Sequence, residues 1–213
     1  GFANQGEICL CGSRVLVQRS IHDEFVDRFV ERVRGLRIGD PDDASTQVGA
    51  LISASHREKV EGYLRLAHED GGSVLCGGVR PTLDGDLANG FFLEPAVITQ
   101  LAPDCRTATE EIFGPVVTVH PFDDEAEALA IANGTRYGLS ASVWTTDLDR
   151  AHRVARNLDC GTVWVNTWLL RDLRVPFGGV KESGVGREGG KWSLEFFSEA
   201  RNVCIRIDER TRT

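Results

Sequence analysis

Apolar and polar residues follow two different periodicities in the first third of the chain. Residues 14–18 (RVLVQ) alternate in the manner of a short strand. A helix is predicted directly after it, over about residues 20–34. The apolar face of this helix repeats every four residues: Ile21, Phe25, Phe29, Val33. Gly35 ends it, and a second amphipathic helix is predicted from about Ser55 to Glu69.

The rest of the chain alternates between strand-like and helix-like segments. Strands are expected at residues 73–76, 91–98, 116–120, 139–145 and 162–166, and helices at residues 124–132 and 147–158. Such alternation is typical of parallel strands with helices on both faces, so the predicted fold class is α/β, with an open, mostly parallel, doubly wound sheet. In sheets of this kind sites gather at the carboxyl ends of the strands, and we expect the site there.

Composition and charge narrow the range of partners. The chain has 213 residues, 41% of them hydrophobic and 26% charged, which is ordinary for a globular domain. A net charge of −8 argues against nucleic acid and anionic membranes as partners. Apolar runs stay shorter than the roughly 18 residues of a membrane span. We therefore expect a cytoplasmic protein.

Six cysteines are scattered along the chain, and two of them lie close together in the stretch NQGEICLCGSR, at Cys9 and Cys11. The spacings complete neither a zinc site nor a dense disulfide framework, so we expect no metal and reduced thiols. From the residues alone, Cys9 and Cys11 could be core thiols or one of them could be a nucleophile. The chain also has no methionine, which suggests part of a longer polypeptide.

Two further stretches allow a functional and an ordinary interpretation. In EEIFGPV, Glu111 and Phe113 could bind a sugar and a flat ligand, but spacing alone favours a solvated acidic turn whose phenylalanine packs on the core. In NTWLLRDLRVPFGG, Arg171 and Arg174 could grip an anion in an apolar pocket, because guanidinium pairs with carboxylates through two hydrogen bonds. An ordinary surface Arg–Asp pair is equally compatible with this stretch.

A third stretch, residues 184–189 (GVGREG), matches the spacing G-x-G-x-x-G of dinucleotide-binding loops. The residues before it, 180–183, do not form a buried strand pattern, and too little chain follows for a strand–helix–strand unit. A flexible turn is the favoured interpretation.

Taken in order, these motifs resemble the aldehyde dehydrogenase superfamily from its nucleophile loop to its C-terminus. The resemblance implies that about half of a typical member would precede Gly1. That missing part would contain the first part of the Rossmann-type cofactor domain, the general-base glutamate and the oxyanion-hole asparagine. We therefore expect the 213 residues alone neither to bind NAD tightly nor to oxidise aldehydes.

The resemblance also implies roles for individual residues. In the family pattern G-Q-x-C the cysteine is the nucleophile, which falls on Cys9, whereas Cys11 falls where many members have alanine. Glu7 stands where most members have glutamine. Glu111 and Phe113 match the positions that contact the nicotinamide riboside of NAD, with NADP not excluded, and this reverses the interpretation of that stretch as an ordinary turn.

The branch of the family can be narrowed further. GEICLC together with WLLRDLR is most similar to the 2-aminomuconic and 2-hydroxymuconic semialdehyde dehydrogenases, whose substrates carry a carboxylate far from the aldehyde. Arg171 falls where broad-specificity relatives have an aromatic residue lining the substrate tunnel, so it is the first candidate for that carboxylate. Arg174 is the second candidate. Phe177 belongs to the PFGG loop at the mouth of the active site.

The expected organisation follows from the same resemblance. Residues 1–199 form the catalytic domain, and residues 200–213 form a C-terminal oligomerisation strand and tail, since residues 202–207 alternate like a strand apart from the sheet. The full-length parent is expected to be a homo-oligomer, a dimer or tetramer.

Two alternatives are kept. One is a cysteine hydrolase that pairs Cys9 with a histidine, although His22, His56 and His152 fall on polar helix positions. The other is a noncatalytic relative that acts as an assembly module.

Overall fold

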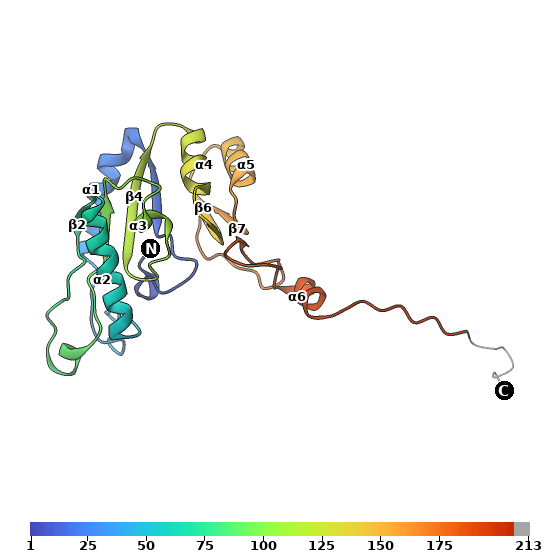
Figure 1. The fold of residues 1–213 in the computed structure, drawn as a ribbon, viewed down its shortest axis with the longest axis horizontal. Helices are drawn as coiled ribbons and strands as arrows, with labels where there is room; N and C mark the ends of the chain where they lie inside the picture. Colours follow the sequence, from blue (N-terminus) through green and yellow to red (C-terminus); the bar gives the residue numbers. More distant parts are fainter. Residues whose placement is uncertain (207–213) are drawn as a thin grey trace.

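A four-stranded sheet forms the body of the computed structural model, which describes residues 1–206 (Figure 1). Its strands, in spatial order, are β1 (Arg14–Gln18), β4 (Val116–Phe122), β3 (Ala96–Thr99) and β2 (Ser73–Cys76). β4 pairs in parallel with both β1 and β3, and β2 pairs antiparallel to β3 at one edge. The predicted α/β class with a mostly parallel sheet is confirmed.

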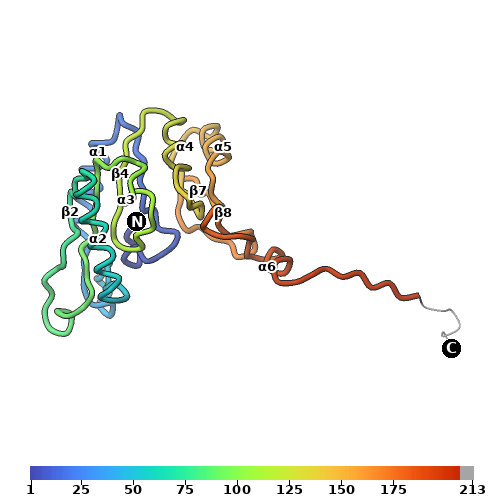
Figure 2. Tube along the Cα trace, in the orientation of Figure 1, coloured from blue at the N-terminus to red at the C-terminus, as the bar shows by residue number. Residues whose placement is uncertain are grey.

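Helices cover both faces of this sheet (Figures 1 and 2). α1 (His22–Arg34) follows a 3₁₀ turn, η2 (Arg19–Ile21), and α2 (Ala54–Glu69) lies on the other face. β3 shows the division: Val97 packs in the cluster that contains α1, whereas Ile98 packs in the cluster that contains α2. Because both faces are buried, β3 reads as a continuous apolar run.

The predicted strand at residues 91–98 is shorter in the structure, because β3 begins only at Ala96. Pro95 precedes it, and proline has no N–H to donate to a neighbouring strand. Phe92 and Leu93 are nevertheless buried, as the apolar pattern required.

The second half of the chain contains the predicted alternation of helices and strands. α4 (Glu125–Asn133), β6 (Ser140–Val143), α5 (Leu148–Asn157) and β7 (Thr162–Val165) follow in order. Asp124 and Asp147 cap the two helices through side-chain hydrogen bonds. β6 and β7 are parallel, as expected, but in the described part of the chain they form a two-stranded sheet of their own.

Short elements complete the fold. They are η1 (Ala3–Gly6), η3 (Gly85–Asn89), α3 (Arg106–Thr109), and the antiparallel pair β5 (Tyr137–Gly138) and β8 (Val180–Lys181). None of the helices within residues 1–206 has the length and apolar character needed to cross a membrane.

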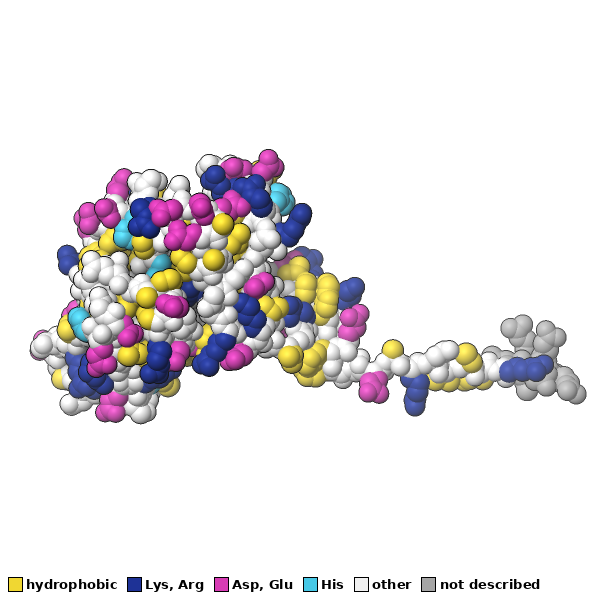
Figure 3. Space-filling model, turned by 45° about the horizontal axis from the view of Figure 1, so that its top comes forward, with side chains coloured by type: hydrophobic (Ala, Val, Ile, Leu, Met, Phe, Trp, Pro, Cys, Tyr) yellow, Lys and Arg dark blue, Asp and Glu magenta, His cyan; other side chains and the backbone are white. Residues whose placement is uncertain are grey.

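The last described residues, up to 206, form a segment that extends away from the body (Figures 1 and 2). It follows α6 (Gly190–Phe197), and apolar side chains gather there and recur along the segment (Figure 3). Val203 and Ile205 are exposed, and residues 202–206 form no strand with the rest of the described chain. The predicted strand at 202–207 is therefore absent up to residue 206, and residues 207–213 lie outside the described residues. Its pairing with a partner subunit stays a prediction.

One titratable side chain lies deep in the sheet. His120 on β4 is 2% exposed, and its Nε2 is 3.0 Å from the Thr118 hydroxyl oxygen. Burial, and then the nearby Arg14 guanidinium, lowers the pKa of His120 to about 4. Its pKa in the unfolded chain is 6.5, so the unfolded state binds this proton first as the pH falls.

We expect His120 to make the fold sensitive to acid. The contribution of its neutral ring to stability is complete above pH 6.5 and is lost as the pH falls toward 4, because protonation then favours the unfolded state. Between pH 7 and 4.5 this loss is about 2–3 kcal/mol. Urea unfolding at both pH values should show a smaller loss for His120→Leu than for the wild type. The same substitution at the exposed His152 is the control and should leave the loss as in the wild type. If His120→Leu lost as much unfolding free energy as the wild type between the two pH values, His120 would not be the group responsible.

Candidate active site

The loop that carries Cys9 is held by a close backbone contact. Asn4, Gln5 and Gly6 have positive φ angles of 49°, 46° and 77°. The backbone of Gly6 lies against Gly114, and a Cβ at Gly6 would be 2.1 Å from the Gly114 carbonyl oxygen. Only glycine fits there. The Cys9 loop and the EEIFGPV stretch, about a hundred residues apart in the sequence, therefore meet.

Glu7 fastens the same loop to the segment before α2. Its side chain is only 9% exposed. Oε1 accepts a hydrogen bond from the Ile52 N–H at 3.2 Å, and Oε2 accepts one from the Gln5 amide at 2.9 Å. The carboxylate is thus committed to holding the loop.

Cys9 and Cys11 occupy different environments. Cys9 is exposed, and the next residue, Leu10, is buried. The Leu10 carbonyl accepts a hydrogen bond from the Trp168 indole at 2.8 Å, which brings the NTWLLRDLRVPFGG stretch to the same loop. Cys11 is half-buried with its sulfur 3.6 Å from the Ala3 carbonyl oxygen, and burial raises the pKa of its thiol. Of the two thiols, Cys9 is the one exposed to solvent.

The turn at residues 110–113 presents two side chains outward. Glu111 and Phe113 are exposed, whereas Ile112 between them is 5% exposed. Phe113 has a φ of 59°, and its ring does not enter the core, contrary to the ordinary-turn interpretation. Glu110, just before them, is partly exposed, and hydrogen bonds from Arg106 and then Tyr63 lower the pKa of its carboxyl to about 2.

The two candidate arginines have different partners. The Arg171 guanidinium carbon lies 4.2 Å from the centre of the Phe177 ring, and its NH2 is 3.6 Å from Glu188. Together they line a hollow of about 220 Å³. Arg174 is 88% exposed and pairs with Asp172 through several hydrogen bonds. For Arg174 this geometry matches the ordinary surface pair.

The GVGREG stretch forms a turn, as its favoured interpretation requires. Gly184, Gly186 and Gly189 all have positive φ, and Glu188 makes an antiparallel bridge with Phe177. This turn closes one side of the hollow at Arg171.

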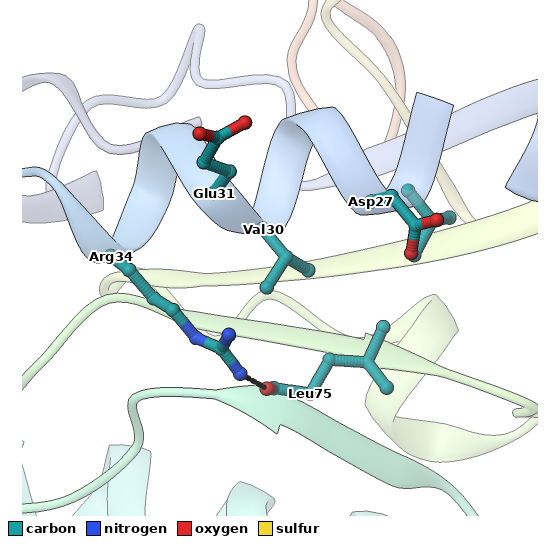
Figure 4. Close-up of a pocket in the computed structure, with 6 residues that line it drawn as sticks. Asp27, Val30, Glu31, Arg34 and Leu75 are labelled. Carbon is teal, nitrogen blue, oxygen red and sulfur yellow. Dashed lines mark hydrogen bonds between the residues drawn. The ribbon is translucent and has the colours of Figure 1, made fainter. Parts of the chain in front are cut away.

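A second hollow, of about 360 Å³, lies between α1 and the edge strand β2 (Figure 4). Arg34 reaches across it to the Leu75 carbonyl oxygen at 2.9 Å, and Asp27 and Glu31 stand on the α1 side. No residue of the NQGEICLCGSR, EEIFGPV, NTWLLRDLRVPFGG or GVGREG stretch lines it. Within residues 1–206 no cluster of three or more His, Cys, Asp and Glu side chains is arranged for a metal ion.

The position of the site relative to the sheet differs from the expectation. Residues 4–11 precede β1 and residues 110–115 precede β4, so both lie at the amino ends of neighbouring parallel strands. Only the Trp168 stretch follows the carboxyl end of a strand, β7. The expected location at carboxyl ends was therefore wrong for the NQGEICLCGSR and EEIFGPV stretches.

Contacts from α2 to this site were missed by sequence reasoning. His56, Lys59 and Tyr63 each bind the turn at residues 110–113, whereas the sequence alone placed only His56, and only at a polar helix position. Their spacing along the helix places them on one face, which is the signal that could have found them.

Gly6→Ala should disturb the site more than the fold. The added Cβ would meet the Gly114 carbonyl and require a positive φ, so we expect a loss of about 1–3 kcal/mol in urea unfolding. The alkylation rate of Cys9, followed by mass spectrometry of its peptide, should also change. Gly12→Ala in the same loop is the control, because a Cβ there would have no heavy atom within 4 Å. Equal behaviour of the two variants would show that the Gly6 contact is unimportant.

Comparison with known proteins agrees with this arrangement. Residues 1–203 match the aldehyde dehydrogenase family. A 2-aminomuconic 6-semialdehyde dehydrogenase from Pseudomonas sp. is 50% identical over 99% of this chain and 43% of its own length. The mouse 2-aminomuconic semialdehyde dehydrogenase is 52% identical over 96% of this chain and 42% of its own. A 2-hydroxymuconic semialdehyde dehydrogenase from Pseudomonas sp. (strain CF600) is 49% identical over 97% and 42%.

Solved structures give the same result. The structure of betaine aldehyde dehydrogenase from Staphylococcus aureus in complex with NAD+ matches with a TM-score of 0.88 and 44% identity, over 91% of this chain and 38% of that one. The chain spans less than half the length of these relatives. The fold and the match over residues 1–203 together show that the chain belongs to the aldehyde dehydrogenase family.

Proposed function

We propose that the protein carrying this chain oxidises a carboxylated semialdehyde, of the 2-aminomuconic or 2-hydroxymuconic type, to the acid with NAD as cofactor. The observation that carries the proposal is the placement of Cys9, an exposed thiol on a loop to which two other motifs attach. The muconic relatives, about half identical over nearly the whole chain, support the substrate class.

The Cys9 thiolate is the group that reacts with the aldehyde. Its sulfur adds to the carbonyl carbon and forms a thiohemiacetal, whose oxyanion is stabilised by donors such as the Cys9 backbone N–H. Loss of a hydride from that carbon leaves a thioester on Cys9, and water then releases the carboxylic acid. The anchored neighbours of Cys9 hold the sulfur in place during these steps.

The outward side chains at residues 111 and 113 fit a dinucleotide. The exposed Glu111 carboxylate can accept hydrogen bonds from ribose hydroxyls, and the exposed Phe113 ring offers a flat surface beside it. NAD, when bound, supplies the acceptor for the hydride. Both side chains belong to a turn whose backbone contacts the Cys9 loop at Gly6 and Gly114, so cofactor and nucleophile would be kept together.

The distal carboxylate of the substrate is assigned to Arg171. Its distance of 3.6 Å to Glu188 is longer than a close charge-assisted hydrogen bond, so guanidinium donors remain for a second carboxylate. Stacking on Phe177 fixes the plane of the guanidinium. Arg174 is a weaker choice, because its guanidinium already donates hydrogen bonds to both carboxylate oxygens of Asp172.

A cysteine hydrolase is less well supported. The histidine that contacts the nucleophile loop is His56, and its Nε2 faces the Phe113 carbonyl oxygen at 2.6 Å and Glu7 at 3.4 Å. Directed at these groups, this nitrogen does not serve as the base for Cys9.

The two cysteines should separate in activity measurements. In the protein expressed from its complete coding sequence, Cys9→Ala should lower NADH formation from 2-hydroxymuconic semialdehyde at least about a thousandfold, since the covalent step is lost. Cys11→Ala is the control and should keep most of the activity. Comparable losses in both variants, or full activity in Cys9→Ala, would exclude Cys9 as the nucleophile.

Arg171→Ala should act on substrate recognition. A lost charge-assisted hydrogen bond corresponds to a rise of about ten- to a hundredfold in KM for the carboxylated semialdehyde. The KM for an uncharged aldehyde should change little, and Arg174→Ala should change neither. Steady-state kinetics with both aldehydes would test this, and equal effects of Arg171→Ala on the two substrates would refute the assignment.

A further inference from the structure

One face of α2 holds the turn that presents Glu111 and Phe113. The His56 ring nitrogen Nε2 lies 2.6 Å from the Phe113 carbonyl oxygen, and Lys59 Nζ donates to the Glu111 carbonyl at 3.1 Å. The Tyr63 hydroxyl donates to Glu110 Oε2 at 2.8 Å. Two of these bonds go to the backbone, so they fix the turn and leave the side chains of Glu111 and Phe113 available.

His56 also approaches the nucleophile loop. Its Nε2 is 3.4 Å from Glu7 Oε1, and both side chains are largely shielded, with 15% and 9% exposed. Among the side-chain hydrogen bonds of the described residues, those of Lys59 and Tyr63 go only to the turn. His56 is therefore placed between the Cys9 loop and the turn.

The chemistry of the neighbours assigns the proton on His56. A backbone carbonyl and a carboxylate are both acceptors, so Nε2 must carry the hydrogen that both approach. The ring also meets the Phe113 ring edge-on, with centroids 6.2 Å apart and planes at 74°. These contacts fix the orientation of the imidazole.

We propose that His56 is a positioning residue that couples the Cys9 loop to the turn of Glu111 and Phe113. It acts through the Glu7 carboxylate and the Phe113 carbonyl, and has no contact with the reacting atoms. The inference rests on the proposed function, because the turn matters for catalysis only if Glu111 and Phe113 hold NAD. A simple stabilising role for His56 would predict a change in unfolding free energy alone.

The first test compares His56→Ala, His56→Gln and His56→Asn in the protein expressed from its complete coding sequence. We expect His56→Ala to raise the KM for NAD by about three- to tenfold, the loss expected for one hydrogen bond. An amide side chain that again donates to the Phe113 carbonyl, from Gln or Asn, should recover part of this loss. His68→Gln, exposed near the end of the same helix, is the matched control and should resemble the wild type.

The second test needs no cofactor. Alkylation of Cys9 by iodoacetamide is followed in His56→Ala, Glu7→Gln and the double variant. If His56 acts through Glu7, the two effects on the rate will be non-additive by at least about threefold. His56→Gln replaces His56→Ala in this cycle if the alanine variant does not fold.

The outcomes separate the two proposals. Additive effects on alkylation together with an unchanged KM for NAD would overturn the role of His56. A change in unfolding free energy with no change in the alkylation rate and none in the KM for NAD would overturn it as well. Non-additive alkylation in a protein that forms no NADH with any semialdehyde would support the coupling and overturn the proposed function instead.

Discussion

Gly6 and Gly114 approach each other so closely that a single Cβ on Gly6 would separate the two segments. This backbone contact is possible because β1 and β4 are adjacent and parallel, with Arg14 opposite Thr118. The loops that enter these strands must then arrive at the same edge of the sheet. A thiol on one loop and an exposed carboxylate and ring on the other are brought together by strand order, before any side chain interacts.

The stability of that edge comes from the two buried layers. β3 and β4 bury side chains on both faces, with Val97 and Val117 toward α1 and Ile98 and Val116 toward α2. Such a sheet cannot shift by one residue without exchanging its two faces, and both faces are packed. The register that sets the Gly6–Gly114 contact is therefore fixed by the core rather than by the site.

Much of the fold could be predicted from the sequence because its signals are local. The apolar spacing of Val60, Leu64 and Ala67 and the Ser53 cap define α2 without reference to other parts of the chain. The separate pairing of β6 and β7 could not be predicted, because alternation of strands and helices does not specify which strands are neighbours. The shortened β3 follows from Pro95, a local signal that a purely hydrophobic interpretation passes over.

For the site, the motif alone predicts Cys9 as the nucleophile, whereas the contacts that hold its loop could not be predicted. The contacts of Glu7 with Ile52 and of Trp168 with Leu10 join residues 45 and 158 positions apart. Asn4 and Gln5 of the same loop also have positive φ angles, a conformation that their side chains do not require. A pattern within one loop carries no information on such partners.

The departure at Glu7 acquires a physical explanation from its surroundings. Three donors converge on this largely shielded carboxylate: the Ile52 N–H, the Gln5 amide and the His56 ring. A carboxylate offers only acceptors and can meet all three. The glutamine of the usual family pattern would keep one oxygen for the Ile52 N–H and the His56 ring, and its NH₂ group would require the Gln5 amide to present its oxygen instead of its nitrogen. Glu7 and His56, 3.4 Å apart, thus face each other as acceptor and donor at the base of the Cys9 loop.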